Sequence, residues 1–410
     1  MNLTKKRWII LTACCLINLC LGSVYAWSVF AAAMADYLSA LLAVKITTGD
    51  LAIVYTIANS VGPITMISGG FFNDRFGARN VILVGGIMFG VGMFLSGFAK
   101  STGFLIVSYG LVFGLGLGMA YGATISTCVK FFPDKKGLIG GLTTAVYGLS
   151  SVILPPIVTL IVQATDVTVA FKAVGIVFLV IVCGCSFLTQ QCPDGFVPEG
   201  WTPPARSGGA GPVNKDWRQM LATPVFYVMI ILLMAGAFSG MMVISQASAI
   251  ARNMVGMSAM MASTAVSILA LFNVAGRIAA GYISDKIGRI NTLMCACILS
   301  IVGLLCLYFT REGSMTAFFV GIAIVGICFG SFMGVFPGFT VDQFGPKNNS
   351  VNYGIMFIGF AVAGYFGPTI MRNVYNADGA YQRAFLIACI LSVAGVALTF
   401  VYRVAVKKGK

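Results

Sequence analysis

The segment GFFNDRFGAR, residues 70–79, has a second copy in this chain, GYISDKIGR at residues 281–289. Each copy has a glycine, an acid four residues later, a base directly after the acid, and a further glycine. The acids Asp74 and Asp285 are 211 residues apart in a chain of 410. A repeat at this spacing predicts two structurally equivalent halves. In each copy we expect the acid to cap the next helix or to pair with a base, and the glycine to allow a tight turn.

The composition indicates a membrane protein. Hydrophobic residues make up 59% of the chain and charged residues only 9%, whereas a soluble domain carries roughly 25% charged residues. The net charge is +14, but the basic residues are scattered singly between apolar runs, which argues against nucleic-acid binding. Nearly all of the 12 cysteines lie inside apolar runs, so we expect small buried side chains rather than disulfides. We expect no metal and no cofactor.

Twelve apolar segments have about the 20 residues that a bilayer crossing needs. They are approximately residues 8–36, 50–72, 80–98, 102–129, 137–163, 168–190, 224–251, 258–283, 290–309, 314–341, 349–372 and 380–403. Each is predicted to be a helix, because unpaired backbone groups cannot face lipid. We therefore predict an all-α polytopic membrane protein with twelve transmembrane helices in two pseudo-symmetric six-helix bundles. The bundles are residues 1–190 and 224–410, joined by a Pro- and Gly-rich loop at 191–223.

The distribution of basic residues predicts the orientation. With the N-terminus inside, eighteen of the 26 Lys and Arg residues fall on the cytoplasmic side and seven on the outer side. This asymmetry places both termini and the loop 191–223 in the cytoplasm, in a multi-pass protein of the cell (plasma) membrane. The first apolar run is too long for a cleaved signal peptide, so we expect an uncleaved first span.

Arg277 is the one basic residue left inside a span. A charge in hydrocarbon costs roughly 2.5–3.5 kcal/mol on insertion scales, and such residues usually face a cavity on a substrate path. Asn273 is four residues earlier on the same helix face, so its amide can orient the guanidinium or a ligand. The alternative is that the Arg277 side chain extends to the cytoplasmic interface.

The twelve spans, the central loop and the paired loop motif resemble the major facilitator superfamily over essentially the whole chain. The resemblance implies two six-helix bundles that rock about a central site and open it alternately to each side. It also implies that the loop motif ties helices together on the cytoplasmic side and favours the outward-open state. The candidate residues of this conformational loop motif are Gly70, Asp74, Arg75, Gly77, Arg79, Gly281, Asp285, Lys286, Gly288 and Arg289.

A narrower resemblance is to the oxalate/formate antiporter branch, which is related to the monocarboxylate transporters. It is carried by GSVYAWS at 22–28, YG at 121–122, KFFPDKKG at 130–137, YG at 147–148, PEGW at 198–201 and NYG at 352–354. The resemblance implies a divalent anion held between an Arg in span eight and a Lys in span eleven. Arg277 matches the first position, whereas Phe360 stands at the second. This departure puts oxalate itself in doubt as the substrate.

Aromatic residues are expected to form the rest of the site. Tyr25, Tyr121 and Tyr147 lie near the midpoints of spans one, four and five, whose counterparts line the cavity in the family. Phe329, Phe357 and Phe360 occupy comparable places in spans ten and eleven. Ordinary packing is the alternative for each of them. The predicted substrate-binding residues are Arg277, Asn273, Tyr25, Tyr121, Tyr147, Phe329, Phe357 and Phe360.

One cation in an aromatic cage suits one carboxylate, such as formate, acetate, lactate or pyruvate, because a second carboxylate would stay unpaired. We therefore expect a monomeric secondary transporter of a small monocarboxylate in the lipid bilayer. An oxalate/formate-type dicarboxylate exchanger is the alternative, or an exporter of another small solute such as a drug. No acid lies mid-span, so exchange is favoured over proton symport, for which Asp36 is the nearest carrier. With no histidine and no metal cluster, the chain lacks the groups that most often carry out acid–base or metal-assisted catalysis in enzymes.

Overall fold

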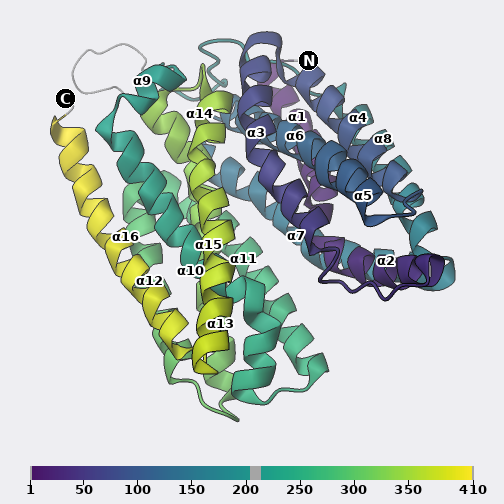
Figure 1. Cartoon of the computed structure of the whole chain (residues 1–410). Coiled ribbons are helices and arrows are strands. Elements are labelled where there is room, and N and C mark those ends of the chain that lie inside the picture. Colours follow the sequence, from purple (N-terminus) through teal and green to yellow (C-terminus); the bar gives the residue numbers. More distant parts are fainter. Residues whose placement is uncertain (1, 204–213, 409–410) are drawn as a thin grey trace. The chain divides into compact units, whose positions relative to one another are not determined.

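The computed structural model describes residues 2–203 and 214–408, which leaves the predicted loop residues 204–213 outside the description. In the described part of the chain, twelve helices are long and apolar enough to cross a membrane (Figure 1). They agree with the twelve predicted spans in number and order. The chain therefore has the predicted all-α architecture of two pseudo-symmetric six-helix bundles.

Most of the helices follow one another with short connections, whereas the stretch 187–216 between two of them is much longer. In chain order they are α1 (Leu3–Leu21), η1 (Gly22–Ala26), α2 (Trp27–Leu42), α3 (Ala52–Phe76), α4 (Ala78–Ser96), α5 (Thr102–Leu105), η2 (Ile106–Phe113), α6 (Gly114–Phe131), α7 (Lys136–Ala164), α8 (Val167–Ser186), α9 (Trp217–Leu221), α10 (Pro224–Val255), α11 (Ala259–Ile287), α12 (Arg289–Phe309), α13 (Met315–Phe344), α14 (Asn349–Met356), α15 (Ile358–Asp378) and α16 (Gln382–Lys408).

The chain forms two compact units, and each takes a short segment from the other half of the sequence. Unit 1 consists of Met1–Asp134, Val146–Asn214 and Gly345–Ile355, and unit 2 of Lys135–Ala145, Lys215–Phe344 and Met356–Lys410. The first turns of α7 therefore pack with unit 2, and nearly all of α14 packs with unit 1. The predicted boundaries at residues 190 and 224 follow the order of the spans and stay a prediction.

The turn of the repeated motif has the same backbone in both copies. Gly77 has φ 86° and ψ 157°, and Gly288 has φ 90° and ψ 152°. An L-residue with a side chain rarely adopts such positive φ values, so the glycine is required here. Each glycine is also the N-cap of the next helix, and no side chain caps that helix. The alternative that the acid of the motif caps the next helix is therefore wrong.

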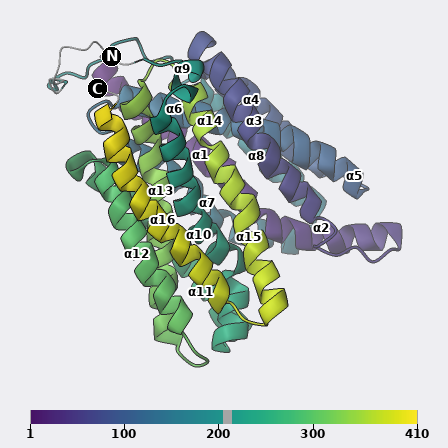
Figure 2. The same cartoon turned by 60° about the vertical axis from the view of Figure 1, so that its left-hand side comes forward.

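Three of the spans are not the continuous α-helices that the sequence predicted. The first span is interrupted by η1, a tight 3₁₀ segment, and Figure 2 shows α2 running in a different direction from α3 and α4. The fourth span has the wider π-helical turns of η2 between α5 and α6, and the eleventh is broken at Phe357, between α14 and α15. Apolar composition indicates that a segment can cross a membrane, but it carries little information about local winding.

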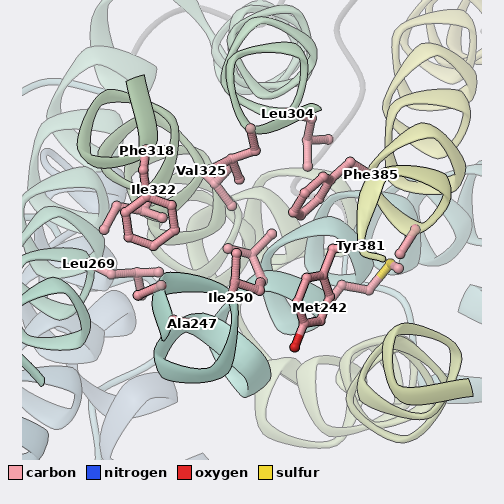
Figure 3. Packing of buried hydrophobic residues seen from close by; sticks show 14 of the residues in the cluster. Met242, Ala247, Ile250, Leu269, Leu304, Phe318, Ile322, Val325, Tyr381 and Phe385 are labelled. Carbon is pink, nitrogen blue, oxygen red and sulfur yellow. The ribbon is translucent and has the colours of Figure 1, made fainter. Parts of the chain in front are cut away.

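Buried apolar side chains hold unit 2 together. Figure 3 shows Leu269 of α11 and Phe318 of α13 on one side of Ile250 of α10, with Met242 of α10 and Phe385 of α16 on the other side and Leu304 of α12 in the same cluster. Lipid tails are as apolar as these side chains, so the gain comes from close packing rather than from leaving water.

Glycines set the spacing between helices in unit 1. A Cβ added to Gly116 of α6 would lie 2.5 Å from both the Gly85 oxygen and the Phe89 nitrogen of α4. Gly114 and Gly118 of the same helix meet α3 in a similar way. The run GLGLG at 114–118 therefore serves close helix packing, one of the two structural roles, packing or bending, that its sequence allows.

We expect Gly116→Leu to lower the thermal stability of the purified protein, because the added side chain forces α4 and α6 apart. Overpacking of this kind costs about 1–3 kcal/mol. Gly184→Leu is the matched control, since a Cβ at Gly184 of α8 has no neighbour within 4 Å. Thermal unfolding followed by size-exclusion chromatography compares the two variants with the wild type. Equal loss of stability in both would contradict the packing role of Gly116.

Candidate functional site

The guanidinium of Arg277 is buried inside unit 2. Its side chain is only 2% exposed, which argues against an extension to the membrane interface. Nη1 donates to the backbone oxygen of Thr144 on α7 at 2.7 Å, and Nε donates to Oδ1 of Asn273 at 3.1 Å. Asn273 thus orients the guanidinium from the preceding turn of α11, one of the two roles that its spacing allows.

Glycines let the neighbouring helices reach the backbone of α11 at this point. A Cβ at Gly141 of α7 or at Gly334 of α13 would overlap the backbone oxygen of Arg277. A Cβ at Gly330 would overlap the backbone oxygen of Asn273. Without these side chains α7 and α13 pack directly on α11, and the Thr144 carbonyl comes within reach of the guanidinium.

The positive charge of Arg277 is not balanced by a carboxylate. Both acceptors of its hydrogen bonds, the Thr144 carbonyl and the Asn273 amide oxygen, are neutral. Among the described residues, no Asp or Glu lies within ion-pair distance of Arg277, and no side chain or carbonyl accepts a hydrogen bond from Nη2. A buried cation is costly unless it is paired. The arrangement therefore suits an anion that binds at the remaining donors, since a guanidinium matches a carboxylate bidentately.

The three predicted phenylalanines come together in unit 2. Phe360 of α15 stacks on Phe357 with ring centroids 4.6 Å apart, and it lies 6.2 Å from the ring of Phe329 of α13. Phe329 directly precedes Gly330, which packs on the backbone of Asn273. The predicted position of a second cation is therefore part of an aromatic cluster.

The three predicted tyrosines come together in unit 1. Tyr147 of α7 contacts Tyr25 of η1 at 5.5 Å and Tyr121 of α6 at 4.7 Å between ring centroids. Tyr25 is 37% exposed, so one side of this cluster is open. Tyr147 is also three residues beyond Thr144 on the same helix, one turn from the carbonyl that binds Arg277.

Two polar residues of α3, Tyr55 and Asn59, are not among the predicted site residues. Asn59 follows Tyr55 by one turn and donates from Nδ2 to the Tyr55 backbone oxygen at 2.9 Å. A signal was present, since Thr56, Asn59 and Ser60 give this span a mean hydropathy of only 1.2. Polar residues inside a span indicate a face that does not meet lipid.

The first copy of the loop motif connects α3 to the start of α14. Asp74 pairs with Lys130 at 2.7 Å and accepts a hydrogen bond from the Val351 nitrogen at 3.2 Å. Asn73 donates to Ser350 at 2.6 Å. A carboxylate at the start of a helix is favourable, because the first backbone N–H groups have no partner within the helix.

The second copy repeats this arrangement in unit 2. Asp285 accepts hydrogen bonds from the nitrogens of Gly137 and Leu138, both at 2.9 Å, in the first turn of α7. It also pairs with Arg289 at 2.7 Å, and Arg289 in turn binds Asp342 at 2.9 Å. The acid of each copy thus pairs with a base, as one of the two sequence alternatives proposed.

The other basic residues of the motif lie over aromatic rings. Arg75 faces Phe76 at 5.5 Å and Arg79 faces Phe187 at 4.7 Å. Lys286 lies 4.4 Å from the ring centroid of Tyr282. In residues 2–203 and 214–408, no group of three or more Cys, Asp, Glu or His side chains is arranged to hold a metal ion.

We expect Asp285→Asn to loosen the first turns of α7, because the amide loses the charge that holds two N–H groups. Charge-assisted hydrogen bonds are worth about 1.5–3 kcal/mol, so amide exchange in residues 136–145 rises about ten-fold or more. Hydrogen–deuterium exchange with mass spectrometry measures it. Asp194→Asn is the control, since Asp194 is exposed in a loop. Unchanged exchange in residues 136–145 would show that Asp285 does not hold this segment.

Curated relatives share this sequence over most of its length. The chain is 30% identical over 364 residues to the uncharacterized MFS-type transporter YhjX of Escherichia coli (strain K12), covering 88% of this chain and 86% of the relative. It is 29% identical over 409 residues to the oxalate:formate antiporter of Oxalobacter formigenes, covering 98% and 92%. It is 25% identical over 340 residues to monocarboxylate transporter 12 of Xenopus laevis, covering 78% and 73%.

Solved structures share the fold. The major facilitator transporter FucP in the outward conformation matches with a TM-score of 0.70 at 13% identity, covering 97% of this chain and 99% of that one. The proton:xylose symporter XylE matches with a TM-score of 0.73 at 13% identity, covering 97% and 96%. These proteins are transporters rather than enzymes. A model of the Major Facilitator Superfamily matches residues 12–368 and again 248–410. The chain therefore belongs to the major facilitator superfamily, and it is a multi-pass membrane transporter.

Proposed function

We propose that this protein is a secondary active transporter of a small monocarboxylate, which it moves by alternating access. The observation that carries the proposal is the buried guanidinium of Arg277, which has neutral acceptors and no carboxylate partner among the described residues. Binding of a carboxylate at Arg277 neutralises this charge, so the substrate itself supplies the missing ion-pair partner. Asn273 keeps the guanidinium oriented while the substrate enters and leaves.

The aromatic residues around Phe360 support a single negative charge on the substrate. A dicarboxylate bound at Arg277 would bring its second carboxylate into apolar surroundings, at a cost of several kcal/mol. Phe329, Phe357 and Phe360 suit the small organic tail of formate, acetate, lactate or pyruvate. We propose that Tyr25, Tyr121 and Tyr147 contact the substrate through their hydroxyls and rings. The relatives named for oxalate and formate and for monocarboxylates support a small organic anion.

Exchange of a dicarboxylate is the second candidate. It is favoured by the relative from Oxalobacter formigenes, an oxalate:formate antiporter that this chain matches over 98% of its length. In either case we propose anion exchange as the driving process. Asp36, the nearest candidate for a proton carrier, is exposed on α2 rather than buried beside Arg277. Proton symport with the substrate is the alternative.

We also propose how the chain is arranged in the cell. Its two six-helix bundles are residues 1–190 and 224–410, and the loop 191–223 lies in the cytoplasm with both termini. The membrane is the cell membrane, and the transporter works as a monomer. The excess of Lys and Arg in the loops of one side supports this orientation.

Arg277→Gln is expected to abolish uptake of labelled formate, acetate or lactate into proteoliposomes, with a loss of about 100-fold. The amide keeps the approximate length of the side chain but cannot pair with a carboxylate. Arg311→Gln, in the exposed loop before α13, is the matched control. Unlabelled mono- and dicarboxylates compete in the same assay, with and without a pH gradient. Undiminished transport by a correctly folded Arg277→Gln protein would reject the site.

Phe360→Lys is expected to shift the preference toward oxalate, because it introduces the second cation that a dicarboxylate needs. The ratio of oxalate to formate inhibition of uptake measures the shift. Phe360→Met is the control, since it changes the side chain without adding charge. The same ratio in all three proteins would mean that this position does not face the substrate.

A further inference from the structure

A polar stripe on α10 lies apart from the candidate site. Ser245, Ser248 and Arg252 are exposed and spaced three and four residues apart, so they share one face of the helix. Exposed side chains on neighbouring spans of unit 2 include large apolar ones, such as Leu271 and Ile298. Apolar faces suit lipid, whereas exposed polar and charged residues of a span face water-filled space. The stripe therefore indicates a face of α10 that meets water.

The stripe lines a concavity of about 560 Å³ in unit 2. Gln246 and Asn253 of α10 and Val266 of α11 also line it. Hydroxyl, amide and guanidinium groups of α10 thus border one volume together with apolar side chains, and the volume is of the size that small-molecule sites have. Ser245 Oγ donates to the Met242 oxygen at 3.0 Å and Asn253 Nδ2 donates to Tyr375 Oη at 3.0 Å, so these two groups are already engaged. The guanidinium of Arg252, the hydroxyl of Ser248 and the amide of Gln246 are groups that donate hydrogen bonds to a carboxylate.

Arg252 has no acidic partner in the described part of the chain. No carboxylate there lies within ion-pair distance of its guanidinium. Glu312 lies near Gly256 one turn away, yet it does not pair with Arg252. A base in the last turn of a helix complements the helix dipole, which accounts for a positive charge at this place. It does not account for the hydroxyl and amide groups around the same volume.

We propose that Arg252, with Ser248 and Gln246, forms a weak outer binding site for the carboxylate of the substrate. This inference rests on the proposed function and adds a binding site that the substrate reaches before Arg277. The site lies at the end of α10 that the distribution of basic residues places outside. An exposed cation in a concavity raises the local concentration of anions and their rate of encounter. Salt screens this effect, because the guanidinium is in contact with water.

The test measures initial uptake of labelled formate, acetate and lactate by the full-length protein in phosphatidylcholine proteoliposomes. At low ionic strength, Arg252→Gln raises KM about three- to ten-fold and leaves kcat within about two-fold of the wild type. The difference disappears in about 0.5 M salt. Arg252→Lys keeps the charge and a KM near that of the wild type. Arg311→Gln, an exposed arginine in the loop at the same end of unit 2, leaves KM unchanged.

Other outcomes would overturn the inference. An unchanged KM and salt dependence in Arg252→Gln, with uptake lost in Arg277→Gln, would remove the outer site and leave the proposed function standing. A lower kcat at constant KM would mean that Arg252 is structural. An effect seen only in vesicles that contain phosphatidylglycerol would assign Arg252 to a lipid phosphate. Absence of carboxylate uptake by the wild type would overturn both proposals.

Discussion

The burial of one guanidinium constrains much of unit 2. Arg277 is tolerated only because a backbone oxygen and an amide oxygen lie within 3.1 Å of its nitrogens. The backbone oxygen comes from Thr144 on a different helix, so α7 must approach α11 closely. Gly141 of α7 makes this approach possible, and Gly330 does the same for α13, because any larger residue would meet the backbone of α11. The charge of Arg277 stays unbalanced, and glycines on two neighbouring helices, α7 and α13, pack against the backbone around this residue.

The repeated loop motif holds helix ends that come from opposite halves of the chain. Asp74 binds the start of α14 and Asp285 binds the start of α7, in each case through backbone N–H groups. These contacts are among those that join short segments of α7 and α14 to units formed mainly by the other half of the sequence. Carboxylate contacts to a helix start can break without exposing an apolar core. They suit the alternating access that we propose.

The substrate proposal depends on charges that are present and on one that is replaced. The cation Arg277 has only neutral acceptors, which favours binding of an anion. Phe360, stacked on Phe357, stands at the place where the antiporter branch has its second cation, so this place carries no positive charge. The polar face of α10 adds a cation in contact with water, at a distance along the chain from Arg277. Together these features describe a pathway for a small anion in which attraction is weak at the entrance and strong in the interior.

The sequence by itself determined the twelve spans, the twofold repeat and the isolation of Arg277, because span length and charge placement in a membrane are set by the cost of leaving water. It also grouped aromatic residues that are in contact within each set, the tyrosines in unit 1 and the phenylalanines in unit 2, and their role at a substrate site stays a prediction. The tertiary structure alone decided the partner of Arg277 and the helix that each Asp binds. Those contacts join residues far apart in the chain. Backbone carbonyl and N–H groups occur in nearly every residue, so the sequence does not indicate which of them accepts or donates a given hydrogen bond.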